Sequence, residues 1–294
     1  MKVGKRLIIL LAVAVIILGI VIAAPAWISK QAGLTADTEV CMTEAGSESG
    51  TEADSGAMAE VVSEHMADGN TEAVTVTEAM DAGHGSYAAA QVQTLCHPDG
   101  TQKVTGGSTA AGATYATGAN GGTTLNDGTS EGKANLALAL IVKDVLLEKG
   151  YDVLMIREDE DCSLDNIART VYANNNADCH LALHYDSTQP DKGFFYIGVP
   201  NVSSYRNMEP VASHWEEHEA LGTALVSGAR NAGVKVYSNG CMALDLTQTS
   251  YSTVPSVDVE VGDRSSDHSE GTLHLLAEGI AGGLDIYFGL DGQD

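Results

Sequence analysis

Residues 74–85 read Val-Thr-Val-Thr-Glu-Ala-Met-Asp-Ala-Gly-His-Gly. The segment Val74–Met80 predicts a β-strand, and the glycines on either side of His84 predict a tight turn directly after it. Open α/β sheets display functional side chains at the carboxyl ends of their strands. This stretch therefore predicts both the first strand of a sheet and a position for a functional histidine.

Strands and helices alternate along the rest of the chain. Further strands are predicted at residues 153–156, 179–184, 194–199, 235–237 and 256–261. Helices are predicted between Ser130 and Gly150 and at residues 163–175, 213–232 and 270–287. The second helix is expected to bury Leu164, Ile167, Ala168 and Val171. The last helix is weakened by Gly271, Gly279, Gly282 and Gly283. The alternation predicts an α/β fold, a single domain with a mixed, mostly parallel twisted sheet and helices on both faces.

The N-terminal segment, residues 1–27, is basic at its start and then apolar from Leu7 to Ala24. A run of this length nearly spans a bilayer core of roughly 30 Å. Two interpretations remain open: an uncleaved transmembrane anchor, which Trp27 favours, or a signal peptide cut near Ala24-Pro25-Ala26. Both place the bulk of the protein outside the cytoplasm, and the first makes the membrane a partner.

Residues 28–72 are predicted to form an acidic disordered linker, because they have too little apolar surface to offset the entropy of ordering. The folded domain is expected at residues 73–291. The chain carries 40 acidic and 15 basic residues and a formal net charge of −25. Such a balance argues against nucleic acid as a partner. We expect a monomer.

An insert, residues 97–130, is dominated by Gly, Thr, Ala, Ser and Asn. Loops longer than about 12–15 residues are usually functional or disordered. The insert is interpreted either as a flexible flap over a site or as a disordered segment with no role.

The five cysteines include no Cys-x-x-Cys pair, which argues against a structural zinc knuckle. An exported protein can form disulfides, but the odd number leaves at least one thiol free or paired with another chain. The chain also has no Gly-x-Ser-x-Gly motif of a serine nucleophile.

Four residues point to metal chemistry. His84, His184 and Glu260 lie at predicted strand ends, and Glu131 lies in the first turn of a helix that begins at the same edge of the sheet. Two imidazoles and one carboxylate make a three-ligand zinc site with an open position. A second carboxylate could then take a proton from water. Glu260 and Asp258 face the same side of their strand, opposite its valines.

Other polar residues have simpler interpretations. His214 and His218 share a helix face and could bind a metal, although the glutamates beside them favour a solvated face. His180 lies on the same face of its strand as His184 and supports the site or the core. Arg169 and Asn174 are expected to fix loop geometry through hydrogen bonds.

The chain resembles the zinc-dependent N-acetylmuramoyl-L-alanine amidases of the amidase type-3 family. The segments that carry the resemblance are residues 81–85, 131–136, 150–157 with Leu164 and Arg169, 173–178, 183–187 and 255–262. The resemblance implies that a Zn²⁺ ion is held by His84, Glu131 and His184 and that Glu260 is the catalytic base. It also implies peptidoglycan as the substrate, with cleavage of the amide between N-acetylmuramic acid and L-alanine of the stem peptide, at the cell wall.

The chain departs from the family pattern in three places: the long insert, Tyr185 after the second histidine, and the turn Asp263-Arg264-Ser265-Ser266. Arg264 could hold a carboxylate of the stem peptide or form a surface ion pair, and Asn174 is a further candidate for substrate binding. Two other functions remain open, a catalytically weak module that binds peptidoglycan and a zinc peptidase that cuts within the stem peptide.

Overall fold

The structure, a computed structural model, describes residues 75–85 and 89–290. The predicted N-terminal segment 1–27 and linker 28–72 lie outside the described residues. Among the residues described, no helix combines the length and the apolar character needed to cross a membrane.

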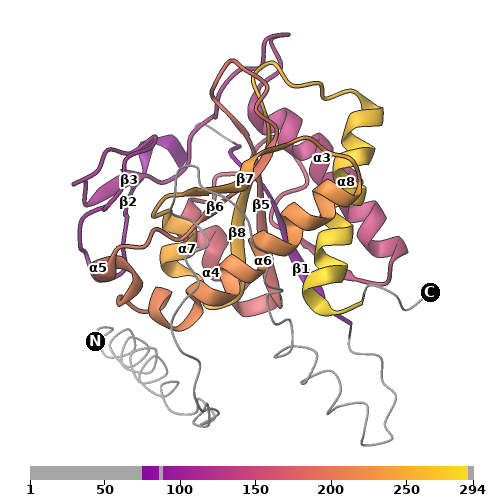
Figure 1. The fold of residues 1–294 in the computed structure, drawn as a ribbon. Coiled ribbons are helices and arrows are strands. Elements are labelled where there is room, and N and C mark those ends of the chain that lie inside the picture. Colours follow the sequence, from indigo (N-terminus) through magenta and orange to yellow (C-terminus); the bar gives the residue numbers. More distant parts are fainter. Residues whose placement is uncertain (1–74, 86–88, 291–294) are drawn as a thin grey trace, which may run out of the picture. The chain divides into compact units, whose positions relative to one another are not determined.

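A six-stranded sheet forms the centre of the domain (Figure 1). Its strands are β1 (Thr77–Ala82), β4 (Asp152–Met155), β5 (Cys179–Asp186), β6 (Phe194–Gly198), β7 (Val236–Ala243) and β8 (Ser256–Asp263). They lie in the order β4-β1-β5-β8-β6-β7. Neighbouring strands are parallel, except that β6 and β8 are antiparallel. The predicted mixed, mostly parallel sheet is thus confirmed.

Helices cover both faces of this sheet (Figure 1). The α-helices of the described part of the chain are α3 (Glu131–Glu148), α4 (Asn166–Asn176), α5 (Ser203–Arg206), α6 (Val211–Asn231), α7 (Thr247–Tyr251) and α8 (Glu270–Phe288). Met80 belongs to the core cluster that contains α3, α6 and α8, whereas the preceding Ala79 packs with Ala173 of α4. Successive strand residues point to opposite faces, so these helices lie on opposite sides of the sheet.

Two predicted elements differ from the structure. The predicted strand 235–237 extends to Ala243, past Ser238 and Gly240, whose positive φ angles allow the strand to continue through an irregular stretch. The predicted apolar face is not buried: Leu164 precedes α4, which begins at Asn166, and is 38% exposed, and Val171 within α4 is 44% exposed. Helix α4 buries Arg169, Thr170 and Ala173 instead. Arg169 tolerates burial because Asp81 of β1 pairs with it, at 2.6 Å.

Glycines in α8 permit close packing against α6 and do not merely weaken the helix. A Cβ atom added at Gly283 would lie 2.5 Å from the Cα of Leu225, and one added at Gly279 would lie 3.0 Å from the Cα of Ala229. A Cβ atom added at Gly282 would meet nothing within 4 Å. Gly279 and Gly283 therefore face α6, and Gly282 faces away from it.

Adjacent glycines of α8 should thus respond oppositely to substitution. Gly283→Ala is expected to lower the free energy of unfolding by about 1–3 kcal/mol, because the helices must separate. Gly282→Ala is expected to raise it by about 0.5–1 kcal/mol, because alanine loses less conformational entropy in a helix. Urea unfolding of the two variants checks this, and a loss of similar size in both would contradict the packing argument.

The insert is ordered and is anchored by one carboxylate. It contains β3 (Tyr115–Thr117), which pairs with β2 (Gln93–Leu95), a strand that ends just before the insert. Asp245, which is fully buried, accepts hydrogen bonds from Nε2 of His97 at 3.0 Å and from the backbone N–H of Val104 at 2.6 Å. It also pairs with Nζ of Lys103 at 3.1 Å. The interpretation of the insert as a disordered segment is therefore wrong.

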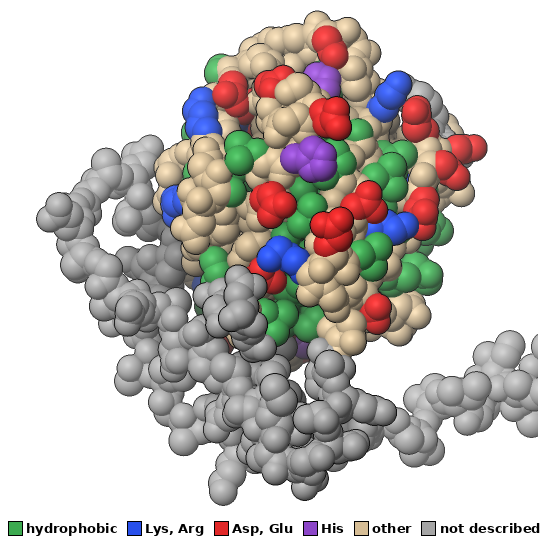
Figure 2. All heavy atoms as spheres, turned by 90° about the vertical axis from the view of Figure 1, so that its right-hand side faces the viewer, with side chains coloured by type: hydrophobic (Ala, Val, Ile, Leu, Met, Phe, Trp, Pro, Cys, Tyr) green, Lys and Arg blue, Asp and Glu red, His purple; other side chains and the backbone are tan. Residues whose placement is uncertain are grey.

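Acidic side chains are spread over the face seen in Figure 2, where they do not gather into one patch. Of the cysteines in the described part of the chain, Cys96, Cys162 and Cys179 are free and buried, and Cys241 is disulfide-bonded. The expectation of at least one free thiol is confirmed.

Candidate metal centre and active site

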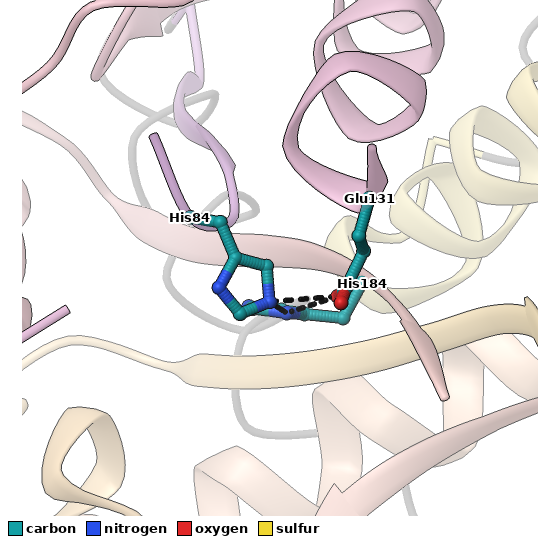
Figure 3. A group of neighbouring side chains, drawn as sticks. All are labelled: His84, Glu131 and His184. Carbon is teal, nitrogen blue, oxygen red and sulfur yellow. Dashed lines mark hydrogen bonds and ion pairs between the residues drawn. The ribbon is translucent and has the colours of Figure 1, made fainter. Parts of the chain in front are cut away.

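Three predicted residues converge at the carboxyl edge of the sheet (Figure 3). His84 lies in the turn after β1, His184 near the end of β5, and Glu131 at the first position of α3. Nε2 of His84 lies 2.8 Å from Oε1 of Glu131, and Nδ1 of His184 lies 3.1 Å from both of these atoms. We call these three residues the ligand cluster; they could hold a metal ion.

The geometry of the ligand cluster fits zinc. In a tetrahedral zinc site with bonds of roughly 2.0–2.1 Å, the ligand atoms lie about 3.3 Å apart. The three donor atoms here form a triangle with sides of 2.8, 3.1 and 3.1 Å, so a small outward adjustment would admit the ion. Two imidazoles and one carboxylate also leave the fourth position open.

The backbone of His84 is held in an unusual conformation. Its φ angle is +68°, in the left-handed region that non-glycine residues rarely adopt. Nη2 of Arg169 donates a hydrogen bond to the carbonyl oxygen of His84 at 2.6 Å. Arg157 donates to the carbonyl oxygens of Ala82, at 2.6 Å, and Gly83, at 3.0 Å. The two arginines thus hold the turn that presents His84, which confirms the predicted structural role of Arg169.

The insert supports two of the three ligands. The carbonyl oxygen of Asn120 lies 3.0 Å from Nδ1 of His84, so Nδ1 carries the hydrogen and Nε2 keeps its lone pair toward the cluster. The backbone N–H of Thr123 donates to Oε2 of Glu131 at 2.7 Å. Gly122 lies against both ligands, because an added Cβ would lie 2.6 Å from Oε2 of Glu131 and 2.7 Å from Cδ2 of His84.

The charges of the ligand cluster depend on one another. Burial alone would raise the pKa of Glu131, but hydrogen bonds from His184 and then from His84 hold this pKa well below its usual range. Burial opposes protonation of His184, yet the nearby Asp258 and then Glu131 raise its pKa to about 10. A cation at this position would replace the proton that these carboxylates attract.

Glu260 lies beside the ligand cluster. It is the register partner of His184 in the adjacent strand β8, and neighbouring strands are about 4.8 Å apart. Oε2 of Glu260 is buried and has no hydrogen-bond partner among the described residues. Burial and then the charge of Asp258 raise the pKa of Glu260 well above its usual range. This is the environment of a carboxyl group that can take up a proton.

A cavity of about 800 Å³ contains the ligand cluster together with Asp258 and Glu260. Its floor is the polar face of β5 and β8, and one wall is formed by the insert, including residues 106–109. Because Asp245 anchors the insert, this wall is fixed to the domain. This volume lies within the range of about 300–1,000 Å³ that is usual for ligand-binding cavities, so the cavity could hold a substrate fragment of that size.

The other residues that the sequence proposed for substrate binding are placed elsewhere. Nε of Arg264 donates to the carbonyl oxygen of Thr124 at 2.8 Å, which joins the end of β8 to the insert. Asn174 donates to the carbonyl oxygen of Tyr251 at 2.9 Å and accepts from the N–H of Thr253 at 3.0 Å. Neither Arg264 nor Asn174 lines the cavity described above. The loop-fixing role predicted for Asn174 is confirmed.

The two histidines of α6 do not form a solvated pair. His218 is buried, accepts a hydrogen bond from the N–H of Ser256 at 3.0 Å, and has its pKa lowered to about 3, mainly by burial. His214 is partly exposed beside Glu217. Glu219 accepts hydrogen bonds from the hydroxyl of Tyr196 and the N–H of Val199. The expectation of a solvated face is therefore wrong for His218 and Glu219.

His180 and Tyr185 pack within the domain. His180 is buried, with Nδ1 3.3 Å from the hydroxyl of Ser256 and Nε2 3.6 Å from Asp81. Tyr185, the departure after the second histidine, belongs to the core cluster, and its N–H donates to Oε1 of Glu131 at 3.2 Å. His180 thus has the supporting position that the sequence predicted.

Two residues of the site were not predicted. Asp258 lies 3.6 Å from Nε2 of His184, and the period-two pattern of β8 already placed it on the same face as Glu260. Asp245, the anchor of the insert, follows β7 and is about 140 residues away from its partners. No local pattern marks such a residue.

Comparison with known proteins identifies a family and a shared fold. The family model described as N-acetylmuramoyl-L-alanine amidase matches residues 79–277. Among solved structures, the chain is similar to the N-acetylmuramyl-L-alanine amidase Ami1 of Mycobacterium smegmatis, with a TM-score of 0.61, 17% identity, and coverage of 74% of this chain and 98% of that chain. The apo form of Ami1 from Mycobacterium abscessus gives a TM-score of 0.56 at 19% identity, with coverage of 72% of this chain and 98% of that chain. The N-acetylmuramoyl-L-alanine amidase AmiC2 of Nostoc punctiforme gives a TM-score of 0.52 at 17% identity, with coverage of 73% of this chain and 97% of that chain. Structural similarity at these identities shows a shared fold. No curated protein matches the chain.

Proposed function

Because the chain belongs to the N-acetylmuramoyl-L-alanine amidase family, we propose that its ligand cluster holds zinc and that Glu260 is the general base of the reaction. The protein is a peptidoglycan amidase that hydrolyses the bond between N-acetylmuramic acid and L-alanine. The observation that carries the zinc proposal is the triangle formed by His84, Glu131 and His184.

The positions of the side chains support these proposed roles. A zinc ion held by the ligand cluster would polarise the scissile carbonyl and make a water molecule more acidic. The carboxylate of Glu260 takes a proton from the attacking water as its oxygen adds to the carbonyl carbon. Glu260 then delivers this proton to the nitrogen of L-alanine as the C–N bond breaks. The products are a lactyl carboxylate on the glycan and a free amine on the stem peptide.

Metal removal tests the zinc proposal. EDTA treatment of the full-length protein is expected to lower the release of stem peptides from purified peptidoglycan at least about 100-fold, and added Zn²⁺ is expected to restore it. Mass spectrometry of the products measures both the rate and the bond that is cut. Release that continues in EDTA at an unchanged rate would exclude a metal-dependent reaction.

The same products separate the amidase from the two other functions that the sequence left open. A binding module would sediment with peptidoglycan without producing new amine or lactyl ends. A peptidase would produce fragments cut within the stem peptide. New ends at L-alanine and at the lactyl group support the proposed reaction.

Cell-wall amidases act outside the cytoplasm, and peptidoglycan as the substrate is implied by the family. We propose further that residues 1–27 tether the protein to the membrane and that the acidic segment 28–72 separates the membrane from the catalytic domain. The apolar run of the first segment and the composition of the second support this proposal. Extraction of the full-length protein from membranes by detergent but not by salt would support the tether, and release by salt alone would contradict it.

A further inference from the structure

Asp258 lies beside the ligand cluster, with its side chain only 14% exposed, and has no part in the reaction proposed above. Its Oδ2 atom lies 3.6 Å from Nε2 of His184. Its Oδ1 atom is buried and has no hydrogen-bond partner among the described residues. A buried carboxylate without a hydrogen-bond partner is energetically unfavourable. We therefore expect Asp258 to accept a hydrogen bond in the functional state of the protein.

The orientation of His184 shows which of its nitrogens can supply that interaction. Nδ1 of His184 faces Glu131 and His84 at 3.1 Å, and Nε2 therefore points away from the metal position. An added Cβ at Gly83 would lie within 3.0 Å of Nε2. The backbone of Gly83 thus confines the ring on one side.

The chemistry of imidazole then assigns the proton. A neutral imidazole has one lone pair and one N–H, so a ring that offers the lone pair of Nδ1 to a metal carries its hydrogen on Nε2. The N–H of a metal-binding histidine is usually accepted by a carboxylate, a carbonyl oxygen or water, which fixes the tautomer and raises the basicity of the ligand. For His84 this acceptor is the carbonyl oxygen of Asn120. For His184, the carboxylate of Asp258 lies in the same cavity, with Oδ2 3.6 Å from Nε2.

We propose that Asp258 is a positioning residue that accepts a hydrogen bond from Nε2–H of His184 when the metal is bound. A shift of a few tenths of an ångström would bring the two atoms into hydrogen-bond range. His84 would then donate its N–H to a neutral acceptor, the carbonyl oxygen of Asn120, and His184 would donate its N–H to a charged acceptor, the carboxylate of Asp258. This inference rests on the proposed metal site.

Zinc affinity of the full-length protein tests this role. Competition with a chromophoric chelator measures the Kd for Zn²⁺ in the native protein and in Asp258→Leu, Asp258→Asn and Glu78→Gln. Glu78→Gln is the matched control, because Glu78 is a fully buried carboxyl in the same sheet that accepts a hydrogen bond from Cys179 of β5. The Leu variant is expected to bind zinc about 10–100-fold more weakly, with a smaller loss in Asn, which keeps an acceptor.

The outcomes distinguish the possible roles of Asp258. An unchanged Kd in the Leu variant overturns the inference, even if activity is lost. Absence of zinc binding by the native protein overturns both the inference and the proposed function. If Asp258→Leu lowers the melting temperature of the metal-free protein, the test uses Asp258→Asn and the absorption spectrum of its Co²⁺ form. Weaker binding of Zn²⁺ together with an altered spectrum supports the positioning role of Asp258. A native Kd and a native spectrum overturn it.

Discussion

Replacing Glu260 with glutamine is expected to lower kcat for stem-peptide release by about 10²–10⁴-fold, the usual contribution of a general base. Glutamine has nearly the same shape but cannot take a proton at neutral pH. Zinc content and Kd for Zn²⁺ are expected to stay close to native, because Glu260 is not part of the ligand cluster. Product release by mass spectrometry and bound metal by elemental analysis check both statements.

Glu278→Gln is the control for this substitution. Glu278 is an exposed glutamate on α8, so its variant makes the same change of side chain at a distance from the cavity. If Glu260→Gln keeps activity within threefold of native while Asp258→Asn loses it, the base has been assigned to the wrong carboxyl group of β8.

The second large effect is expected at Asp245. Asp245→Ala leaves the buried Lys103 without its carboxylate partner and removes the acceptor of His97. Breaking a buried pair in this way typically costs about 3–5 kcal/mol. The insert should then separate from the domain, with faster hydrogen exchange across residues 97–123. Because Asn120 and Thr123 support two ligands, zinc affinity should also fall.

Asp99→Asn is the matched control for the anchor. Asp99 lies in the same insert, is exposed, and makes its hydrogen bonds to Thr101, two residues away. It is expected to change the free energy of unfolding by no more than about 0.5 kcal/mol. Equal hydrogen exchange in Asp245→Ala and in the native protein would show that other contacts hold the insert.

The three residues of the ligand cluster could be placed together from the sequence because each lies at a position that sequence patterns mark well. His84 follows a strand and stands between glycines, and Glu131 begins a helix directly after its N-cap residue Ser130. Strand ends and helix starts of a mostly parallel sheet meet at one edge, so these residues could be brought together without knowledge of distances. The alternation along β8 also placed Asp258 on the same face as Glu260. The sequence does not show that Asp258 lies 3.6 Å from His184.

The features that escaped prediction depend on partners far away in the chain. Helix α4 was expected to bury its aliphatic side chains, but its buried face includes Arg169, whose partner Asp81 is 88 residues away. The insert has a composition typical of disorder, and its order comes from Asp245. In α8, glycines that weaken an isolated helix are favourable because α6 packs against them. The helix or loop propensity of a segment depends on that segment alone and therefore does not predict contacts with residues far away in the chain.

The turn that carries His84 has a further consequence. Guanidinium groups of Arg157 and Arg169 donate hydrogen bonds to its carbonyl oxygens, so side chains of the protein itself hold the turn in place. Preorganisation of this kind would reduce the loss of entropy that accompanies binding of an ion at the ligand cluster.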